Sequence, residues 1–166
     1  MQRSQNQYHH LNLLLLLGWF VGFSINASAQ TIPEITRTRQ FNTQKGLALA
    51  GYDPVAYLKN SEATKGSAQF ATTYKSTTYW FATATNREIF LKNPTQYEPA
   101  YGGWCAYAMG ATGEKVAVDP ETFEVRDGRL YLFYNRLFNN TLPKWQKDVL
   151  NLHRRADTNW QKLTQS

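Results

Sequence analysis

The clearest periodic pattern of apolar positions lies near the end of the chain. From Trp145 onward, apolar residues recur at spacings of 4, 3, 4, 4 and 3, which places them along one face of a helix. Thr141 is expected to cap this helix, and Pro143 to lie in its first turn. The pattern therefore predicts a long C-terminal helix whose buried face consists of Trp145, Val149, Leu152, Ala156, Trp160 and Leu163.

Alternation of apolar and polar residues predicts extended structure in two central regions. The segment TFEVRDGRLYLF (122–133) alternates on both sides of Asp127-Gly128, and both of these positions accept the positive φ of a two-residue hairpin turn. The segments 68–76 and 77–83 are rich in aromatic residues and threonine, which are typical of strands. We expect each region to form an antiparallel hairpin.

Shorter patterns predict two further helices and one more strand. Thr85 and Glu88 have the spacing of a capping box, which predicts a helix beginning there and ending before Pro94. The apolar segment 104–109 is expected to form a short helix, and the alternating segment 114–119 a strand.

The first 29 residues have the pattern of a signal peptide. Arg3 precedes an apolar run, Leu11 to Ile25, and the small residues Ala27-Ser28-Ala29 then predict cleavage before Gln30. The run is shorter than the ~20 residues that span a bilayer, so no stable membrane span is expected after cleavage. An uncleaved anchor is the alternative. The prediction is a periplasmic or secreted protein.

The rest of the chain is expected to contain one folded domain. Residues 30–46 are polar, include Pro33 and show no apolar period, which indicates a leader or linker. The domain then covers 47–166, a length suited to one buried core and too short for two ordinary domains. Its predicted fold is α+β, a small single domain of antiparallel hairpins packed against a few helices.

Charge and cysteine content restrict the function. Without the signal peptide, 17 basic and 12 acidic residues remain, and a net charge of +5 favours contact with anionic surfaces. An exported chain seldom meets nucleic acid, so no nucleic-acid partner is expected. The single cysteine, Cys105, excludes a disulfide within the chain and any metal site made only of cysteines.

Three segments together resemble the exported branch of the YHS-domain proteins. They are GYDPVAYL (51–58), YWFATATNREIFLKNPTQYEPAYGG (79–103) and WCAYA (104–108). The Tyr-His-Ser tripeptide that names the family is absent. The resemblance implies a YHS-like domain, and it implies a fold rather than an activity.

The chain departs from the metal-binding members of that family. The resemblance aligns Ala56, Ala82 and Asn86 with the three positions at which those members have cysteines. Alanine cannot ligate a metal, and the asparagine amide is a poor ligand for the soft metals that thiolates hold. We therefore expect no cofactor at these positions.

The two most family-like segments contain the candidate binding residues. Each has a backbone break beside aromatic and polar side chains, and binding residues gather at such breaks. We expect a site for a small molecule or partner protein that includes Tyr52, Asp53, Tyr57, Tyr101, Trp104, Cys105 and Tyr107. Two alternatives stay open: the aromatic residues form a core whose hydroxyls reach nearby backbone, and Asp53 and Asp119, each before a proline, serve only in turns.

Cys105 suggests two further hypotheses. Cys105 and Met109 are four residues apart, so they share a helix face, and with His153 as a third donor they could bind Cu(I). A catalytic thiolate would need a base nearby, and no histidine is close to Cys105 in sequence. The sequence favours an exported, non-enzymatic binding module of unknown ligand, with copper handling and then a thiol-based enzyme as alternatives.

Overall fold

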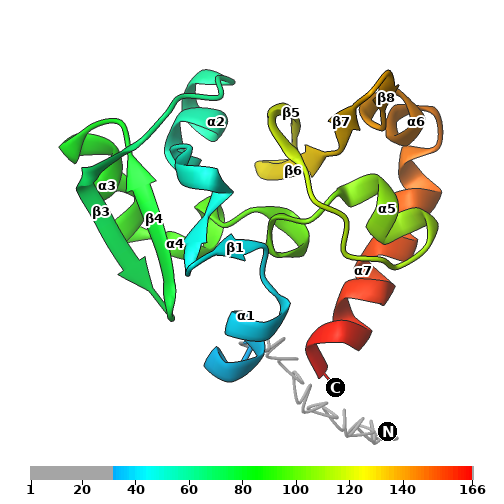
Figure 1. Ribbon diagram of the computed structural model, residues 1–166, viewed down its shortest axis with the longest axis horizontal. Helices are drawn as coiled ribbons and strands as arrows, with labels where there is room; N and C mark the ends of the chain where they lie inside the picture. Colours follow the sequence, from blue (N-terminus) through cyan, green and yellow to red (C-terminus); the bar gives the residue numbers. More distant parts are fainter. Residues whose placement is uncertain (1–31, 166) are drawn as a thin grey trace, which may run out of the picture. The chain divides into compact units, whose positions relative to one another are not determined.

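Helices and short strands alternate along residues 32–165, which are the residues that the computed structural model describes (Figure 1). The predicted signal peptide lies outside them. The helices are α1 (Glu34–Gln40), α2 (Pro54–Asn60), α3 (Ala84–Lys92), α4 (Pro94–Tyr97), α5 (Ala106–Ala111), α6 (Leu142–Lys147) and α7 (Val149–Gln165), with 3-10 turns η1 (Leu49–Gly51) and η2 (Ala100–Gly103). The strands are β1 (Thr43–Gln44), β2 (Leu47–Ala48), β3 (Ser67–Tyr74), β4 (Thr77–Phe81), β5 (Asp119–Arg126), β6 (Arg129–Phe133), β7 (Asn135–Arg136) and β8 (Asn139–Asn140). The predicted fold, a small α+β domain with antiparallel hairpins and a long C-terminal helix, is confirmed.

The strands form three small sheets. The largest has the order β1-β2-β4-β3, in which the predicted antiparallel pair β3–β4 is confirmed and β2 joins β4 in parallel at Leu47 and Thr78. Strands β5 and β6 pair around Asp127 and Gly128, whose φ angles of 51° and 70° are those of the predicted two-residue turn. Strands β7 and β8 form the third pair.

Two local predictions near these strands are wrong. Residues 114–118 are not a strand, because their one backbone bond to another segment joins the Val116 carbonyl to the Cys105 N–H and no ladder follows. Helix α3 is capped by Thr83 and not by Thr85, since Thr83 has an extended backbone just before the helix and its hydroxyl accepts the N–H of Asn86 at 3.0 Å. Thr85 lies inside the helix.

The predicted C-terminal helix is divided in two. The backbone leaves the helical conformation at Asp148, with φ −143° and ψ 45°, so α6 and α7 are separate helices. The predicted face is otherwise confirmed, because Trp145 is fully buried and α7 buries Leu152 and Ala156. Val149, Trp160 and Leu163 pack beside them and are half-buried. Among the described residues, no helix is both long and apolar enough to cross a membrane.

The interior contains two clusters of apolar side chains that share one strand. The hairpin cluster lies between the β3–β4 hairpin and helices α2 to α4, and the helix cluster lies among η2, α5, α6 and α7. Side chains of a strand alternate between its faces. In β6, Leu130 and Leu132 therefore enter the hairpin cluster, whereas Tyr131 and Phe133 enter the helix cluster. Strand β6 separates the two clusters.

The segment expected to be a leader or linker is, where described, folded against the domain. Helix α1 buries Arg37 and Gln40, and Phe41 follows as a buried residue. The ring of Phe41 meets the ring of Trp160 in α7 edge to face, with their centroids 5.7 Å apart. Within the predicted leader or linker, 30–46, residues 34–41 are therefore part of the folded domain, because Arg37, Gln40 and Phe41 are buried against it.

Candidate functional site

Asp53 is a fully buried carboxylate held by four hydrogen-bond donors. Its Oδ1 accepts the N–H groups of Val55 (2.8 Å) and Ala56 (3.3 Å) at the start of α2. Its Oδ2 accepts the Ala82 N–H at 2.8 Å and the side-chain amide of Asn86 at 2.7 Å. The arrangement is that of a helix cap extended to a second segment. The turn interpretation of Asp53 is confirmed, and no position at a pocket mouth is shown.

The same contacts involve the three residues that the resemblance aligns with cysteines. Ala56 and Ala82 offer Asp53 a backbone N–H, and Asn86 offers its side-chain N–H. All three are donors to one carboxylate. In this chain the positions serve to satisfy a buried negative charge, which supplies the structural reason why an asparagine is useful at position 86.

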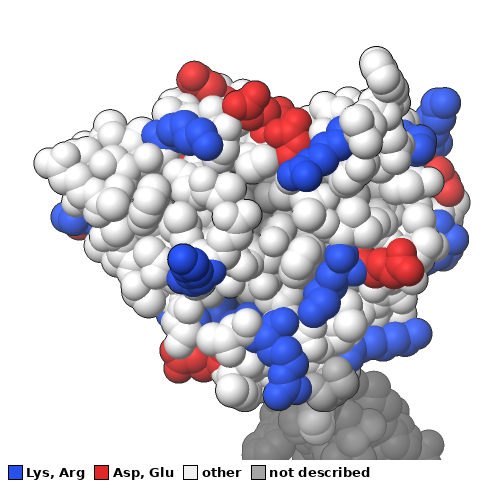
Figure 2. Space-filling model, in the orientation of Figure 1, with Lys and Arg blue, Asp and Glu red and all other residues white. Residues whose placement is uncertain are grey.

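Tyr52 and Tyr57 both direct their hydroxyls at β5. Tyr52 donates to Glu121 Oε1 at 2.7 Å, and Tyr57 donates to the Pro120 carbonyl at 2.8 Å. The hydrogen bond to Glu121, with burial, raises the pKa of Tyr52 to about 12. The Lys65 ammonium lies 3.9 Å from the centre of the Tyr52 ring. Figure 2 shows acidic side chains gathered where Figure 1 places α2 and β5. Tyr57 confirms the core interpretation, because its hydroxyl reaches a backbone carbonyl, whereas Tyr52 is buried in the core but its hydroxyl reaches a side-chain carboxylate.

Tyr101 and the two glycines after it form a tight connection. The buried Tyr101 donates its hydroxyl to Asp157 Oδ1 at 3.0 Å, and burial raises its pKa above the ordinary value. Gly102 has φ 59°, and a Cβ there would lie 2.7 Å from the Trp160 ring. The glycine is needed for the backbone conformation and for this close approach.

Trp104 and Tyr107 are the half-buried aromatic residues of the second segment. Trp104 lies two residues before α5 and Tyr107 lies in its first turn, and the Trp104 indole N–H donates to the Gln40 carbonyl at 2.6 Å. A lysine ammonium lies near each ring, Lys115 at 5.8 Å from Trp104 and Lys144 at 6.0 Å from Tyr107. We call these four side chains the α5 face. It is cationic and aromatic.

The predicted binding residues do not form one site. Tyr52 and Tyr57 belong to the hairpin cluster, whereas Tyr101 belongs to the helix cluster, which Trp104 and Tyr107 border. Strand β6 lies between the two groups because it buries both of its faces. Residues 51–57 and 101–107 therefore do not line a single pocket.

Cys105 is buried in the interior. Its Sγ lies 3.4 Å from Thr141 Oγ1 and accepts the Tyr134 N–H at 3.4 Å. Thr141 also donates to the Tyr134 carbonyl at 3.0 Å, so the thiol joins a small polar group at the start of the last helices. The thiol is thus fully buried, and its contacts are with other residues of the domain.

The other two candidate copper ligands have separate surroundings. Met109 is buried in the helix cluster, and the His153 ring nitrogens face Tyr131 Oη at 2.9 Å and Asp157 Oδ2 at 3.4 Å. The structure thus gives Cys105 and His153 different partners. Within residues 32–165, no group of three or more His, Cys, Asp or Glu side chains is placed to hold a metal ion.

Sequence reasoning missed a chain of polar contacts that runs through His153. Asp157 accepts the Tyr101 hydroxyl and faces His153, which in turn faces the Tyr131 hydroxyl. These contacts tie η2, α7 and β6 together. In the sequence, the spacing of four residues between His153 and Asp157 could have indicated this chain of contacts, because residues four apart are neighbours on a helix surface.

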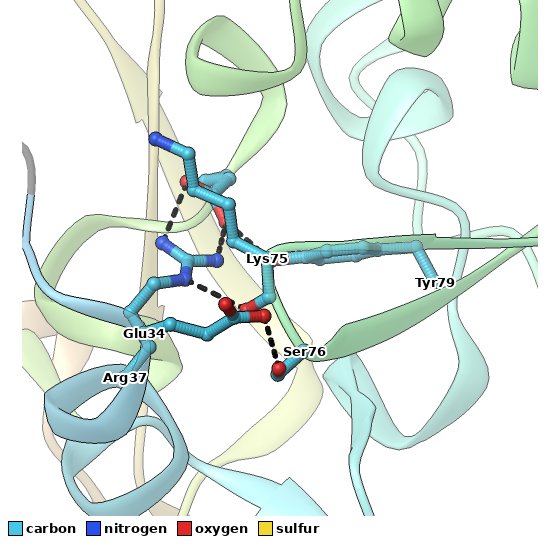
Figure 3. A network of polar contacts seen from close by, with 6 residues as sticks. Glu34, Arg37, Lys75, Ser76 and Tyr79 are labelled. Carbon is cyan, nitrogen blue, oxygen red and sulfur yellow. Dashed lines mark hydrogen bonds and ion pairs between the residues drawn. The ribbon is translucent and has the colours of Figure 1, made fainter.

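It also missed the ion pair that docks α1 (Figure 3). Arg37 forms a two-point contact with Glu98 and donates through Nε to the Lys75 carbonyl at 3.1 Å. Tyr79 donates its hydroxyl to the same carboxylate at 2.7 Å. The side chains of Arg37 and Glu98 are 4% and 13% exposed. No sequence pattern marks a buried arginine in a polar segment.

The fold and contacts define a small α+β domain in which the most reactive predicted groups are engaged within the protein. No model of a known family, no curated protein and no solved structure matches the chain. The resemblance to YHS-domain proteins accordingly stays a prediction.

Proposed function

We propose that the chain is an exported, non-enzymatic binding module of the YHS type that recognises a small molecule or a partner protein. The resemblance of 51–58, 79–103 and 104–108 supports the family. The signal-like pattern of 1–29 supports export. The observation that carries the binding role is the α5 face, where two half-buried aromatic rings each have a lysine beside them.

The chemistry of this face favours an anionic ligand. An aromatic ring offers a flat apolar surface, and an ammonium group beside it offers a charge for a carboxylate or a phosphate. Lys115 is held in place by Gln40, whose side-chain oxygen lies 3.0 Å from Nζ. Asp53 and Cys105, by contrast, have all their contacts inside the protein, which supports binding over catalysis.

Nuclear magnetic resonance can test the proposal. The labelled chain is titrated with a set of small carboxylates, phosphates and sulfonates, and the Trp104 indole signal and the α5 amides are followed. We expect shifts at these signals, weakened by Lys115→Gln and unchanged by Lys92→Gln, an exposed lysine on α3. Shifts confined to another surface, or equal in both variants, would contradict the proposal. Stoichiometric Cu(I) binding abolished by Cys105→Ser would support the copper alternative instead.

A further inference from the structure

The turn between β7 and β8 exposes two large apolar side chains. Leu137 is 90% exposed, and Phe138 is completely exposed. Figure 2 shows an uncharged projection where Figure 1 places this turn, with basic side chains beside it. Single exposed leucines are common on protein surfaces. Two adjacent large apolar residues at the tip of a hairpin are less common, and their exposure shows that no part of residues 32–165 covers them.

The backbone of this turn is also unsuited to the residues it carries. Leu137 and Phe138 have φ angles of 50° and 64°, the pair of positive values that a type I′ turn requires. Asn-Gly is the favoured pair in such turns, and bulky residues with a Cβ are strained there. The stability of the turn therefore does not explain why leucine and phenylalanine occupy these positions. A function of their side chains would explain it.

The turn is held firmly at its base. Asn135 pairs with Asn140, and the Thr141 N–H donates to the Tyr134 carbonyl at 3.0 Å. The Asn135 side chain donates to Thr122 of β5 at 3.0 Å. The buried Cys105 thiol accepts the Tyr134 N–H, so it helps to fix the same base. These hydrogen bonds fix the base of the turn, so the two apolar side chains at its tip stay directed outward.

The charged residues that surround this turn in the sequence are all basic. Between Asp127 and Asp148 the chain carries four basic residues and no Asp or Glu: Arg129, Arg136, Lys144 and Lys147. Arg136 and Lys144 lie closest to the tip, since Arg136 precedes Leu137 and the Lys144 ammonium lies 2.8 Å from Asn139 Oδ1. Exposed apolar side chains with two cations beside them complement an anionic lipid surface.

We propose that the β7–β8 turn docks the protein on an anionic membrane surface. Leu137 and Phe138 enter the boundary between headgroups and acyl chains, while Arg136 and Lys144 meet the lipid phosphates. A projecting tip of two side chains offers far less than the ~800 Å² per partner of a typical protein interface. A bilayer has no such requirement, because it closes around an isolated projection. This site shares Lys144 with the α5 face, but its apolar tip of Leu137 and Phe138 is separate from that face, and the proposal does not depend on the function proposed there.

Vesicle binding tests this inference. Protein from the exported fraction, with its N-terminus established by intact mass, is sedimented with vesicles of phosphatidylcholine alone or with phosphatidylglycerol. We expect binding that requires phosphatidylglycerol, and a loss of at least about tenfold for Phe138→Ser, the scale of exposing one large apolar side chain. Arg136→Gln should weaken binding about fivefold, as expected for one cation near an anionic surface. Ile35→Ser on α1 and Lys92→Gln on α3 are matched controls that should bind as the wild type does.

The double variant L137N/F138G separates docking from folding. It introduces the residue pair that a type I′ turn favours, so its melting temperature should rise while vesicle binding is lost. A second readout is local: with Phe138→Cys carrying an environment-sensitive fluorophore, emission should shift to the blue on anionic vesicles. The buried Cys105 should not react with the label. Equal binding of wild type and L137N/F138G, or no emission shift, would overturn the proposal. The proposal would also be overturned if the protein did not bind vesicles and instead bound a partner protein in a way that requires Phe138.

Discussion

Replacing Arg37 by alanine should destabilise the domain far more than an exposed substitution does. The change removes the two-point contact with Glu98, the bond to the Lys75 carbonyl and the packing of the guanidinium over Phe41, whose ring centre is 4.2 Å from Cζ. It also leaves the carboxylate of Glu98 in a largely buried position with only the Tyr79 hydroxyl as a partner.

The magnitude follows from the burial of the pair. Breaking a buried ion pair by removing one partner costs about 3–5 kcal/mol, because the remaining charge is uncompensated. Glu98 keeps one hydrogen bond and 13% exposure, which places the expected loss at the lower end of that range. The lost bond to the Lys75 carbonyl adds about 1 kcal/mol. We therefore expect the free energy of unfolding to fall by about 4 kcal/mol.

Urea unfolding followed by circular dichroism measures this loss. Arg39→Ala is the matched control, because Arg39 lies in the same helix and is exposed, and it should change stability by less than about 0.5 kcal/mol. In a double-mutant cycle, Arg37→Ala combined with Glu98→Gln should cost less than the sum of the single changes, since the unpaired charge is gone. If Arg37→Ala cost no more than Arg39→Ala, α1 would be the linker that the sequence suggested, and the reasoning would be refuted.

Three other substitutions or titrations test the packing described above. Asp53→Asn turns an N–H group toward the Ala82 and Asn86 donors, so it should lower the free energy of unfolding by about 1–3 kcal/mol in urea; an unchanged midpoint would contradict the four-donor arrangement. In Gly110→Ala the new Cβ would lie 2.5 Å from the Leu152 carbonyl oxygen, and the forced separation of α5 and α7 should cost about 1–3 kcal/mol, measured as a lower melting midpoint. Folding raises the pKa of Tyr52 from 10.0 to about 12, so its contribution to stability is intact below pH 10.0 and is lost as the pH rises toward 12. Tyrosinate absorbance with circular dichroism checks this, and Tyr52→Phe should reduce the alkaline loss.

Elements set by local chemistry were predictable from the sequence. The β5–β6 hairpin depends on Asp127-Gly128, two adjacent residues that accept the turn, and on the alternation around them. Helix α7 depends on spacing alone. The break at Asp148 was not predictable in this way, because a spacing of four between Trp145 and Val149 fits a continuous helix as well as two helices.

Elements set by distant contacts were missed. Helix α1 is docked by the pair of Arg37 and Glu98, which are 61 residues apart, and a hydrophobic pattern does not mark charged residues that become buried. The cap of α3 was misplaced because Thr83 and Thr85 both have a polar residue three positions later, and only the backbone conformation, extended at Thr83 and helical from Ala84, decides between them.

The candidate site was predicted from segments, which indicate what a residue does locally but not which residues lie together in the fold. The turn role of Asp53 follows from Asp-Pro chemistry, and the structure confirms it. The separation of Tyr57 from Tyr101 depends on β6 burying both faces, which a run of apolar residues at 130–133 permits but does not specify.

A strand that serves two cores limits how the sequence can diverge. Inserting or deleting one residue within 130–133 would exchange the faces and direct Tyr131 and Phe133 into a space filled by Leu130 and Leu132. Length changes in this lineage should therefore accumulate in exposed turns and avoid the strand itself. Because neither cluster can lose β6 without exposing the other, the two halves should melt in one cooperative transition, and no stable fragment should be obtained by cutting the chain between them.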